Sequence, residues 1–346
     1  MNSRLKALRD TLKSEKLDAI LLSSSSNIYY ISAFSGMDSY CLVTDSRSFI
    51  ITDFRYHEQA EKESADFDVI SKGGSLLKKT SMLINKLAIK RVGFEPYHLS
   101  VQEFKLLSGT KHKRFKPVFQ LLEQQRMQKG AEEIIAIKRA CVIAKNSIKE
   151  LGQKIREGKK EKDIAARLDL LMRNKGADSP AFQTIVASGP NASMPHAKAT
   201  ERRIRPSEPV IVDCGAKRDE YNSDLTRTFF VGKISQSFKL IYNIVKTAQS
   251  KAISKVAPGR KISDIDKTAR DYISGKGFGE YFGHATGHGI GIDVHEPPAI
   301  NSKNQSILKE GMVFTVEPGI YIPGSGGVRI EDMVLVTAKG HEVLTR

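Results

Sequence analysis

The sequence contains no tryptophan, few cysteines and no long apolar run. Its 3 cysteines, Cys41, Cys141 and Cys214, lie far apart, and such an odd, scattered set does not predict a disulfide framework. No apolar run approaches the roughly 20 residues that a membrane-spanning helix requires. The N-terminal segment Met1–Asp10 is charged and mixed, so it lacks the apolar core of a signal peptide. These absences predict a cytoplasmic protein with no membrane partner.

Acidic residues are scarce relative to basic ones: 39 aspartates and glutamates face 55 lysines and arginines, for a formal net charge of +16. A basic balance of this size is found in proteins that bind nucleic acids or anionic surfaces. Here the short basic clusters, such as Lys159–Lys162 and Arg202–Arg205, are not interleaved with aromatic residues that stack on bases. We therefore interpret the charge as solvated surface and predict no specific nucleic-acid partner.

The length of 346 residues and the 40% hydrophobic content are sufficient for two domains. The first third alternates helical spacing with short apolar runs such as Tyr40–Thr44, which predicts a mixed α/β domain. The polar segment 123–130 has no strong periodicity and is interpreted as a linker. We therefore place the two domains at residues 1–122 and 123–346.

The C-terminal two thirds contain a repeated pattern of helices followed by a hairpin. The first hairpin is expected at Val210–Val231 and the second at Met312–Thr337, each after long amphipathic segments. Each hairpin carries two acidic residues in otherwise apolar strands. The expected fold class is α+β, with a C-terminal domain of two pseudo-symmetric helix–hairpin halves.

The four acidic residues of these hairpins are the most informative feature of the sequence. Asp213 and Asp224 belong to the first hairpin, and Glu317 and Glu331 belong to the second. Carboxylates are rarely buried unless they are paired or bind a cation, and facing carboxylates repel each other. Hard divalent cations relieve that repulsion. Strand alternation also places Arg329 on the face of Glu331, where it is expected to hold this carboxylate ionised and oriented.

Three of the 8 histidines lie between the hairpins, at His284, His288 and His295, in a segment rich in glycine. A neutral imidazole is a good ligand for Mn, Co, Zn or Fe, and glycines allow the backbone to approach such a site closely. Taken singly, Asp213 or Asp224 is more typical of a hairpin or cap residue than of a ligand. The conjunction of four acids with a glycine-flanked histidine favours a metal centre.

The ordered motifs are similar to those of a known family. They are Val-Asp-Cys-Gly-Ala, Ser-Asp-Leu-Thr-Arg-Thr, Gly-His-Gly-Ile-Gly, Val-His-Glu-Pro-Pro, Thr-Val-Glu-Pro-Gly-Ile-Tyr and Val-Arg-Ile-Glu-Asp. The chain resembles the creatinase/aminopeptidase, or pita-bread, metallopeptidases, and within them the Xaa-Pro peptidases, aminopeptidase P and prolidase. The motif Ile-Thr-Asp-Phe-Arg-Tyr extends this resemblance into the first domain, so it covers nearly the whole chain.

The resemblance implies two divalent metal ions held by five residues, which are Asp213 on the first ion, Asp224 and Glu331 bridging both, and His288 and Glu317 on the second. A carboxylate-rich ligand set favours Mn or Co, with Zn and Fe as alternatives. The resemblance also implies a homodimer.

Further roles follow from the same resemblance. Glu317 would shuttle the proton, His295 would stabilise the developing oxyanion, and His196 and His284 would hold the substrate or the leaving group. Because an Xaa-Pro bond has no N–H, a dedicated pocket is also needed. Its wall is expected to include Tyr321 and residues 323–327.

The expected activity is removal of the N-terminal residue from peptides with proline in the second position. Some prolidases place an arginine just after the His-Glu-Pro segment to hold the dipeptide carboxylate, whereas this sequence has Ala299 there, which favours the aminopeptidase. The Xaa-Pro dipeptidase, or prolidase, is the alternative. A methionine aminopeptidase, a creatinase and a non-catalytic binding module are disfavoured, the first by the large N-terminal domain and the other two by the complete ligand set.

Overall fold

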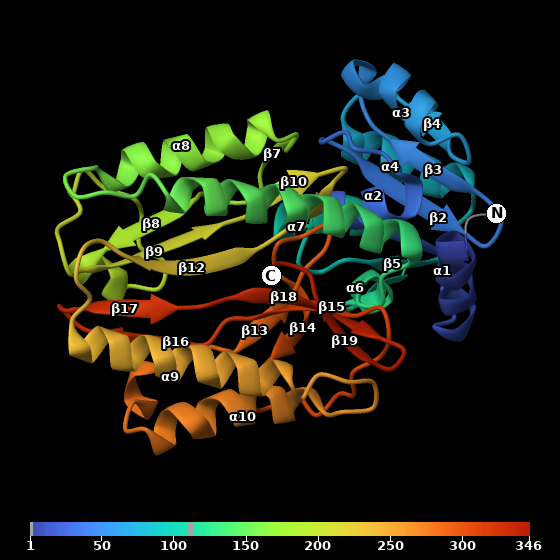
Figure 1. Ribbon diagram of the computed structural model, residues 1–346. Helices are drawn as coiled ribbons and strands as arrows, with labels where there is room; N and C mark the ends of the chain where they lie inside the picture. Colours follow the sequence, from blue (N-terminus) through green and yellow to red (C-terminus); the bar gives the residue numbers. More distant parts are fainter. Residues whose placement is uncertain (1–2, 110–113) are drawn as a thin grey trace. The chain divides into compact units, whose positions relative to one another are not determined.

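A computed structural model describes residues 3–109 and 114–346, and its contacts divide the chain into the units Met1–Arg126 and Met127–Arg346. Figure 1 colours the first unit from blue to teal and the second from green to red. No helix among the described residues is both long and apolar enough to span a membrane.

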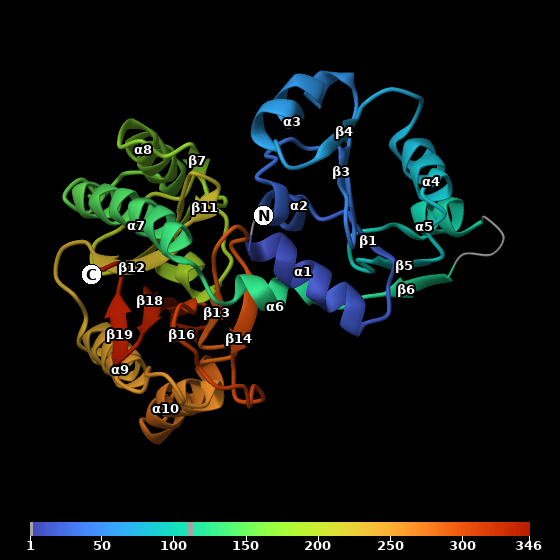
Figure 2. The ribbon, with the colours of Figure 1, turned by 90° about the vertical axis from the view of Figure 1, so that its right-hand side faces the viewer.

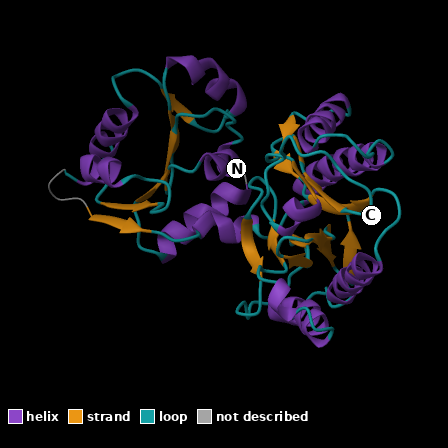
Figure 3. Ribbon diagram, turned by 90° about the vertical axis from the view of Figure 1, so that its left-hand side faces the viewer, coloured by secondary structure: helices purple, strands orange, loops and turns teal. Residues whose placement is uncertain are grey.

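The first unit is built on one mixed sheet whose strand order is β4-β3-β2-β1-β5-β6. Figure 2 shows α4 and α5 on one face of this sheet and α1 and α2 on the other, and Figure 3 shows the strands between helices. Strands β1 and β2 are buried along their whole length, as their apolar sequences predict. The elements are α1 (Ser3–Ser14), β1 (Ala19–Leu22), α2 (Ser25–Ser32), β2 (Tyr40–Thr44), β3 (Ser48–Ile51), the 3-10 helix η1 (Phe54–Tyr56), α3 (His57–Glu63), β4 (Asp68–Ile70), α4 (Leu76–Lys86), β5 (Arg91–Phe94), α5 (Val101–Ser108), β6 (Arg114–Pro117) and α6 (Leu121–Arg126).

Helix α6 occupies the first half of the segment 123–130, which was expected to be a linker. The buried Arg126 donates to Asn27 Oδ1 over 2.8 Å, and Asn27 donates to Glu95 and Glu123. This polar network holds α6 against α2, and hydrophobic periodicity gives no sign of it. The interpretation of residues 123–130 as a linker is therefore wrong for its first half, and the boundary expected after residue 122 falls inside α6.

The first half of the second unit packs two helices on a three-stranded antiparallel sheet of order β12-β9-β8. Helix α7 buries a stripe at helical spacing that includes Ile137, Cys141, Ala144, Ile148 and Leu151. The elements are α7 (Ala131–Gly152), α8 (Glu161–Asn174), β7 (Ser179–Pro180), β8 (Ile185–Ser188), the 3-10 helix η2 (Gly189–Ser193), β9 (Pro209–Cys214), β10 (Ala216–Arg218), β11 (Tyr221–Asn222) and β12 (Leu225–Phe230).

The second half repeats this plan with a separate hydrophobic core. Figure 1 shows α7 and α8 along one side of the unit and α9 and α10 along the other, with the strands between them. The elements are α9 (Gln236–Ile253), α10 (Ile262–Gly275), the 3-10 helix η3 (Gly279–Tyr281), β13 (Gly287–Gly289), β14 (Glu296–Ile300), β15 (Val313–Val316), β16 (Gly319–Ile322), β17 (Gly326–Arg329), β18 (Asp332–Thr337) and β19 (Gly340–Val343). The predicted α+β class with two helix–hairpin halves is confirmed.

Both predicted hairpins form; Asp213 lies within β9, whereas the other three acidic residues lie at strand ends. Strand β9 pairs with β12 and β15 pairs with β18, both antiparallel. Asp224 directly precedes β12, whereas Glu317 directly follows β15 and Glu331 directly precedes β18. The strand that was expected to carry both Arg329 and Glu331 is therefore two strands, β17 and β18, with Glu331 between them. Side chains of a regular strand alternate between the two faces of its sheet. A residue just outside the strand does not follow this alternation, so its side chain can point toward the opposite hairpin.

Glycines let the backbone approach closely on either side of His288, as the sequence predicts. A Cβ atom on Gly287 would lie 1.9 Å from the Thr315 carbonyl oxygen, and one on Gly289 would lie 2.2 Å from that of Pro297. Both distances are far below van der Waals contact, so β13 can lie between β14 and β15 only with glycine at these two positions.

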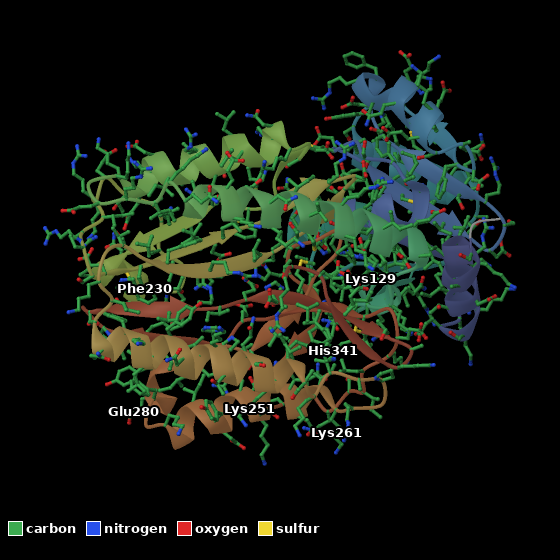
Figure 4. The ribbon with its side chains drawn as sticks, in the orientation of Figure 1. Lys129, Phe230, Lys251, Lys261, Glu280 and His341 are labelled. Carbon is green, nitrogen blue, oxygen red and sulfur yellow. The ribbon has the colours of Figure 1, made fainter. Side chains whose placement is uncertain are left out.

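A buried ion pair fixes the start of the second unit. Lys129, labelled in Figure 4, precedes α7, and its Nζ lies 2.8 Å from Glu296 Oε1 at the start of β14. The two side chains are 1% and 2% exposed. Removal of one partner from such a pair is costly, because the other charge stays buried without compensation.

We expect Glu296→Ala to lower the free energy of unfolding by about 3–5 kcal/mol, measured by urea denaturation. Glu342→Ala is the matched control, because Glu342 forms a half-exposed pair with Lys138 and such pairs contribute only about 0–1 kcal/mol. The double variant Lys129→Met/Glu296→Gln, which buries no charge, should recover part of the loss. Equal losses in Glu296→Ala and Glu342→Ala would refute this account.

Candidate metal centre

One cavity of the second unit gathers every candidate site residue. It has a volume of about 520 Å³, within the usual range for small-ligand sites. Its wall includes all nine residues singled out from the sequence, namely His196, Asp213, Asp224, His284, His288, His295, Glu317, Arg329 and Glu331. Tyr321 lines the cavity as expected, whereas none of residues 323–327 is among the lining residues.

A cluster of three side chains forms the centre of this wall. Asp224, His288 and Glu331 each place one ligand atom within 4.8 Å of the others. His288 Nε2 lies 3.6 Å from Asp224 Oδ2 and 3.3 Å from Glu317 Oε1. The cluster thus combines residues from both hairpins with the strand β13 that lies between them.

The His288 ring is held in the form that binds a metal. Its Nδ1 lies 3.1 Å from the Gly289 carbonyl oxygen, which can only accept a hydrogen bond, so Nδ1 carries the proton. The lone pair of Nε2 is then directed at the carboxylates. Burial, with the nearby His295, lowers the pKa of His288 to about 4, so the ring is neutral at pH 7.

The carboxylates of the cluster destabilise one another. Burial, and then the charges of Glu331 and Asp213, raise the pKa of Asp224 well above its ordinary value. Burial, and then the charges of Glu317 and Asp213, do the same to the pKa of Glu331. Burial also raises the pKa of Glu317 to about 7, against the opposing charge of Arg329. The group is stable at neutral pH only with bound protons or with cations in their place.

Two buried carboxylate oxygens indicate that cations, and not protons alone, stabilise this group. Asp213 Oδ1 and Asp224 Oδ1 have no hydrogen-bond partner among the described residues. Buried polar atoms are almost always satisfied, so an orphaned carboxylate oxygen is expected where a ligand is to bind. The donor atoms are carboxylate oxygens and one imidazole nitrogen, with no thiolate. This set fits Mn²⁺ or Co²⁺ and is consistent with Zn²⁺ or Fe²⁺.

Arg329 holds a different carboxylate from the one expected. Its Nη2 donates to Asp213 Oδ2 over 2.6 Å, and both side chains are nearly buried. It reaches Glu331 only through Thr226: Arg329 Nε donates to Thr226 Oγ1 over 3.0 Å, and that hydroxyl donates to Glu331 Oε2 over 2.7 Å. Strand alternation did not predict the partner of Arg329 because the strand conformation ends at Arg329 and resumes only at Asp332.

A second hydrogen-bond chain leads from Arg329 to a histidine. Arg329 Nη1 donates to the Tyr321 hydroxyl over 3.0 Å, and that hydroxyl lies 3.0 Å from His284 Nε2. Burial raises the pKa of Tyr321 to about 12 and lowers that of His284 to about 4. The tyrosine therefore keeps its proton, and its O–H donates a hydrogen bond to Nε2 of the neutral imidazole, whose Nδ1–H donates to the Ala285 carbonyl oxygen over 2.8 Å.

The loop that carries His196 is fixed at both ends. Arg329 Nη1 donates to the Pro195 carbonyl oxygen over 3.1 Å. At the other end the fully buried Glu161 accepts from the Thr200 backbone N–H over 3.0 Å and from its hydroxyl over 2.6 Å. The ring of His295 lies beside that of His288, with 4.3 Å between their centroids, and burial lowers its pKa.

The sequence interpretation missed the hydroxyls that orient the acids. Thr226 orients Glu331, and Thr315 donates to Glu317 Oε1 over 3.1 Å while accepting from the His288 backbone N–H. The one available signal in the sequence was the alternation of two hydroxyl side chains, Thr226 and Thr228, within the strand that follows Asp224. Lys198 was also missed, because a lysine in a polar loop has no pattern that separates it from surface charge.

Comparison with known proteins agrees with this geometry. Residues 4–128 match the Creatinase/Prolidase N-terminal domain, and residues 135–338 match metallopeptidase family M24. The Xaa-Pro dipeptidase of Pyrococcus horikoshii is 38% identical over 351 residues, which cover 100% of this chain and 97% of that protein.

Two solved structures are similar over nearly the whole chain. The Xaa-Pro dipeptidase from Bacillus anthracis is 38% identical with a TM-score of 0.96, covering 99% of this chain and 97% of that one. The X-Pro aminopeptidase from Thermotoga maritima is 37% identical with a TM-score of 0.92 and the same coverage. The expected pita-bread architecture is confirmed. The chain therefore belongs to metallopeptidase family M24, is a hydrolase of its Xaa-Pro peptidase branch, and carries a creatinase/prolidase-type N-terminal domain.

Proposed function

We propose that the protein is a metal-dependent Xaa-Pro dipeptidase, which hydrolyses the bond between the first residue and proline in dipeptides. The observation that carries this proposal is the cluster of four carboxylates and one imidazole on the wall of a cavity of about 520 Å³. The dipeptidases of Bacillus anthracis and Pyrococcus horikoshii, each 38% identical over almost the whole chain, support dipeptides as the substrates.

The five ligand candidates would hold two divalent ions, preferably Mn²⁺. Asp213 would bind the first, His288 and Glu317 would bind the second, and Asp224 and Glu331 would bridge them. Ions held there supply an activated water and polarise the scissile carbonyl group.

The other side chains have complementary tasks. Glu317 would take a proton from the attacking water and give it to the departing proline nitrogen. His295 would donate to the oxygen of the carbonyl under attack. His196 and His284 would hold the substrate, the latter oriented by the Tyr321 hydroxyl. Arg329 holds Asp213 in place through its 2.6 Å ion pair.

Proline specificity needs an apolar wall more than a row of hydrogen-bond partners. The amide nitrogen before the proline ring carries no hydrogen, so an extended backbone pairing cannot select it. The cavity provides Phe182, Ile185 and Val294, against which a pyrrolidine ring can pack.

A second candidate is an Xaa-Pro aminopeptidase that acts on longer peptides. Two observations favour it: Ala299 stands where some prolidases carry a carboxylate-binding arginine, and the X-Pro aminopeptidase of Thermotoga maritima is 37% identical. Chain length of the preferred substrate separates the two functions.

We expect the Mn²⁺-loaded protein to cleave Ala-Pro faster than Ala-Pro-Ala and to leave Ala-Ala intact, with release of alanine measured by chromatography. Glu331→Gln should reduce kcat/KM by about a thousandfold or more, since it removes a bridging carboxylate. Glu342→Gln, the same change on an exposed residue of β19, should retain full activity.

Faster cleavage of Ala-Pro-Ala would move the assignment to the aminopeptidase. The peptidase proposal fails if the folded protein cleaves none of these peptides with Mn²⁺, Co²⁺ or Zn²⁺.

Binding of Mn²⁺ should release protons at pH 7. Burial raises the pKa of Glu317 to about 7 and, together with mutual repulsion, raises the pKa values of Asp224 and Glu331, so the metal-free cluster binds protons that it must lose to bind a cation. Metal affinity should therefore fall as the pH is lowered. Calorimetric titration in buffers of different ionisation enthalpy measures the release, and an enthalpy independent of the buffer would contradict it.

A further inference from the structure

One cationic side chain on the cavity wall has no structural task. Among the described lining residues, the lysines and arginines are Lys198 and Arg329. Arg329 is committed to Asp213, Tyr321 and the Pro195 carbonyl. Lys198 forms no hydrogen bond or ion pair with any described residue, and it is an exposed residue that lines the cavity. An ammonium group at this position is available to a ligand.

The backbone on either side of Lys198 is fixed by hydrogen bonds to two buried side chains. Arg329 binds the Pro195 carbonyl on one side of it, and Glu161 binds Thr200 on the other. Ala197 between them is buried and its N–H donates to the Met194 carbonyl oxygen over 3.2 Å. The lysine stem therefore begins at a fixed point, unlike that of a lysine on a loose surface loop.

A dipeptide substrate brings an anion into this cavity. Its C-terminal carboxylate lies one residue, about 3.5 Å of extended chain, beyond the scissile bond. That carboxylate loses part of its hydration on entering the cavity, so a free cation on the wall would favour its binding through a charge-assisted hydrogen bond. Ala299, also on the wall, supplies no charge.

We propose that Lys198 binds the C-terminal carboxylate of the dipeptide substrate and so favours dipeptides over longer peptides. This inference rests on the proposed Xaa-Pro peptidase function and assigns the residue that recognises the substrate's end. A lysine is a compact charge on a flexible stem, in contrast to the rigid fork of an arginine. It can move aside when the chain continues, so longer Xaa-Pro peptides are disfavoured without being excluded.

The test compares Ala-Pro with Ala-Pro-amide, which has the same scissile bond without the carboxylate. In Lys198→Met, KM for Ala-Pro should rise roughly tenfold, as expected for one lost charge-assisted hydrogen bond, with kcat little changed. KM for Ala-Pro-amide should stay within about twofold, because its terminus makes no ion pair. Lys198→Arg should retain most of the affinity for Ala-Pro.

Two further variants separate charge from structure. Lys246→Met, on the exposed face of α9 and away from the cavity, is the matched control and should behave as the unmodified protein. The double variant Lys198→Met/Ala299→Arg, which returns a cation to the same cavity, should restore KM for Ala-Pro.

Binding measured without turnover distinguishes this inference from the proposed function. Calorimetry with the Mn²⁺-loaded protein should show that Lys198→Met weakens binding of L-proline but not of L-prolinamide. Equal losses for the acid and the amide would show a structural role and overturn the inference, and so would no loss for either. If the protein cleaves no Xaa-Pro peptide, the proposed function fails, and the proline and prolinamide titrations still decide the role of Lys198.

Discussion

The second unit brings four carboxylates, three of them buried and one half-buried, to the meeting point of two hairpins, and the rest of the site is arranged around their mutual repulsion. Asp213 and Asp224 come from one half, and Glu317 and Glu331 come from the other. Burial and neighbouring charge raise the pKa values of Asp224 and Glu331, so the arrangement costs free energy unless protons or cations are bound. The surrounding contacts keep these groups together. Thr226, Thr315 and Arg329 each orient a carboxylate, and two glycines allow β13 to bring His288 between the hairpins.

The hairpin pattern and the acidic positions were predictable from the sequence, because a carboxylate in an apolar strand is unusual on general physical grounds. The contacts of Arg329 were not. Alternation along one continuous strand would have placed it beside Glu331, but the strand breaks at Glu331 and the guanidinium pairs with Asp213 across the halves. Helix α6 was missed for a related reason: its anchor is a polar network around Asn27, which depends on residues distant in sequence.

In the proposed function Lys198 meets the end of the substrate and Asp213 helps to hold the metal, and Arg329 contacts the structure that carries each of them. The same guanidinium that fixes Asp213 also holds Pro195, at the start of the loop that carries His196 and Lys198. Lys198 in that loop and Ala299 in β14 both line the cavity, so a change of charge at either position would act on the substrate without touching a ligand candidate.

The two halves of the second unit have separate hydrophobic cores, and the chain passes between them once, from β12 to α9. A cation bound by both Asp224 and Glu331 would add to the Arg329–Asp213 ion pair between the halves and act as a reversible cross-link. Such a link closes a long loop of chain, and long loops gain most from closure. The supply of metal would then affect the stability of the folded protein as well as its catalytic rate. The form without ions keeps the repulsion between the carboxylates and lacks the cross-link.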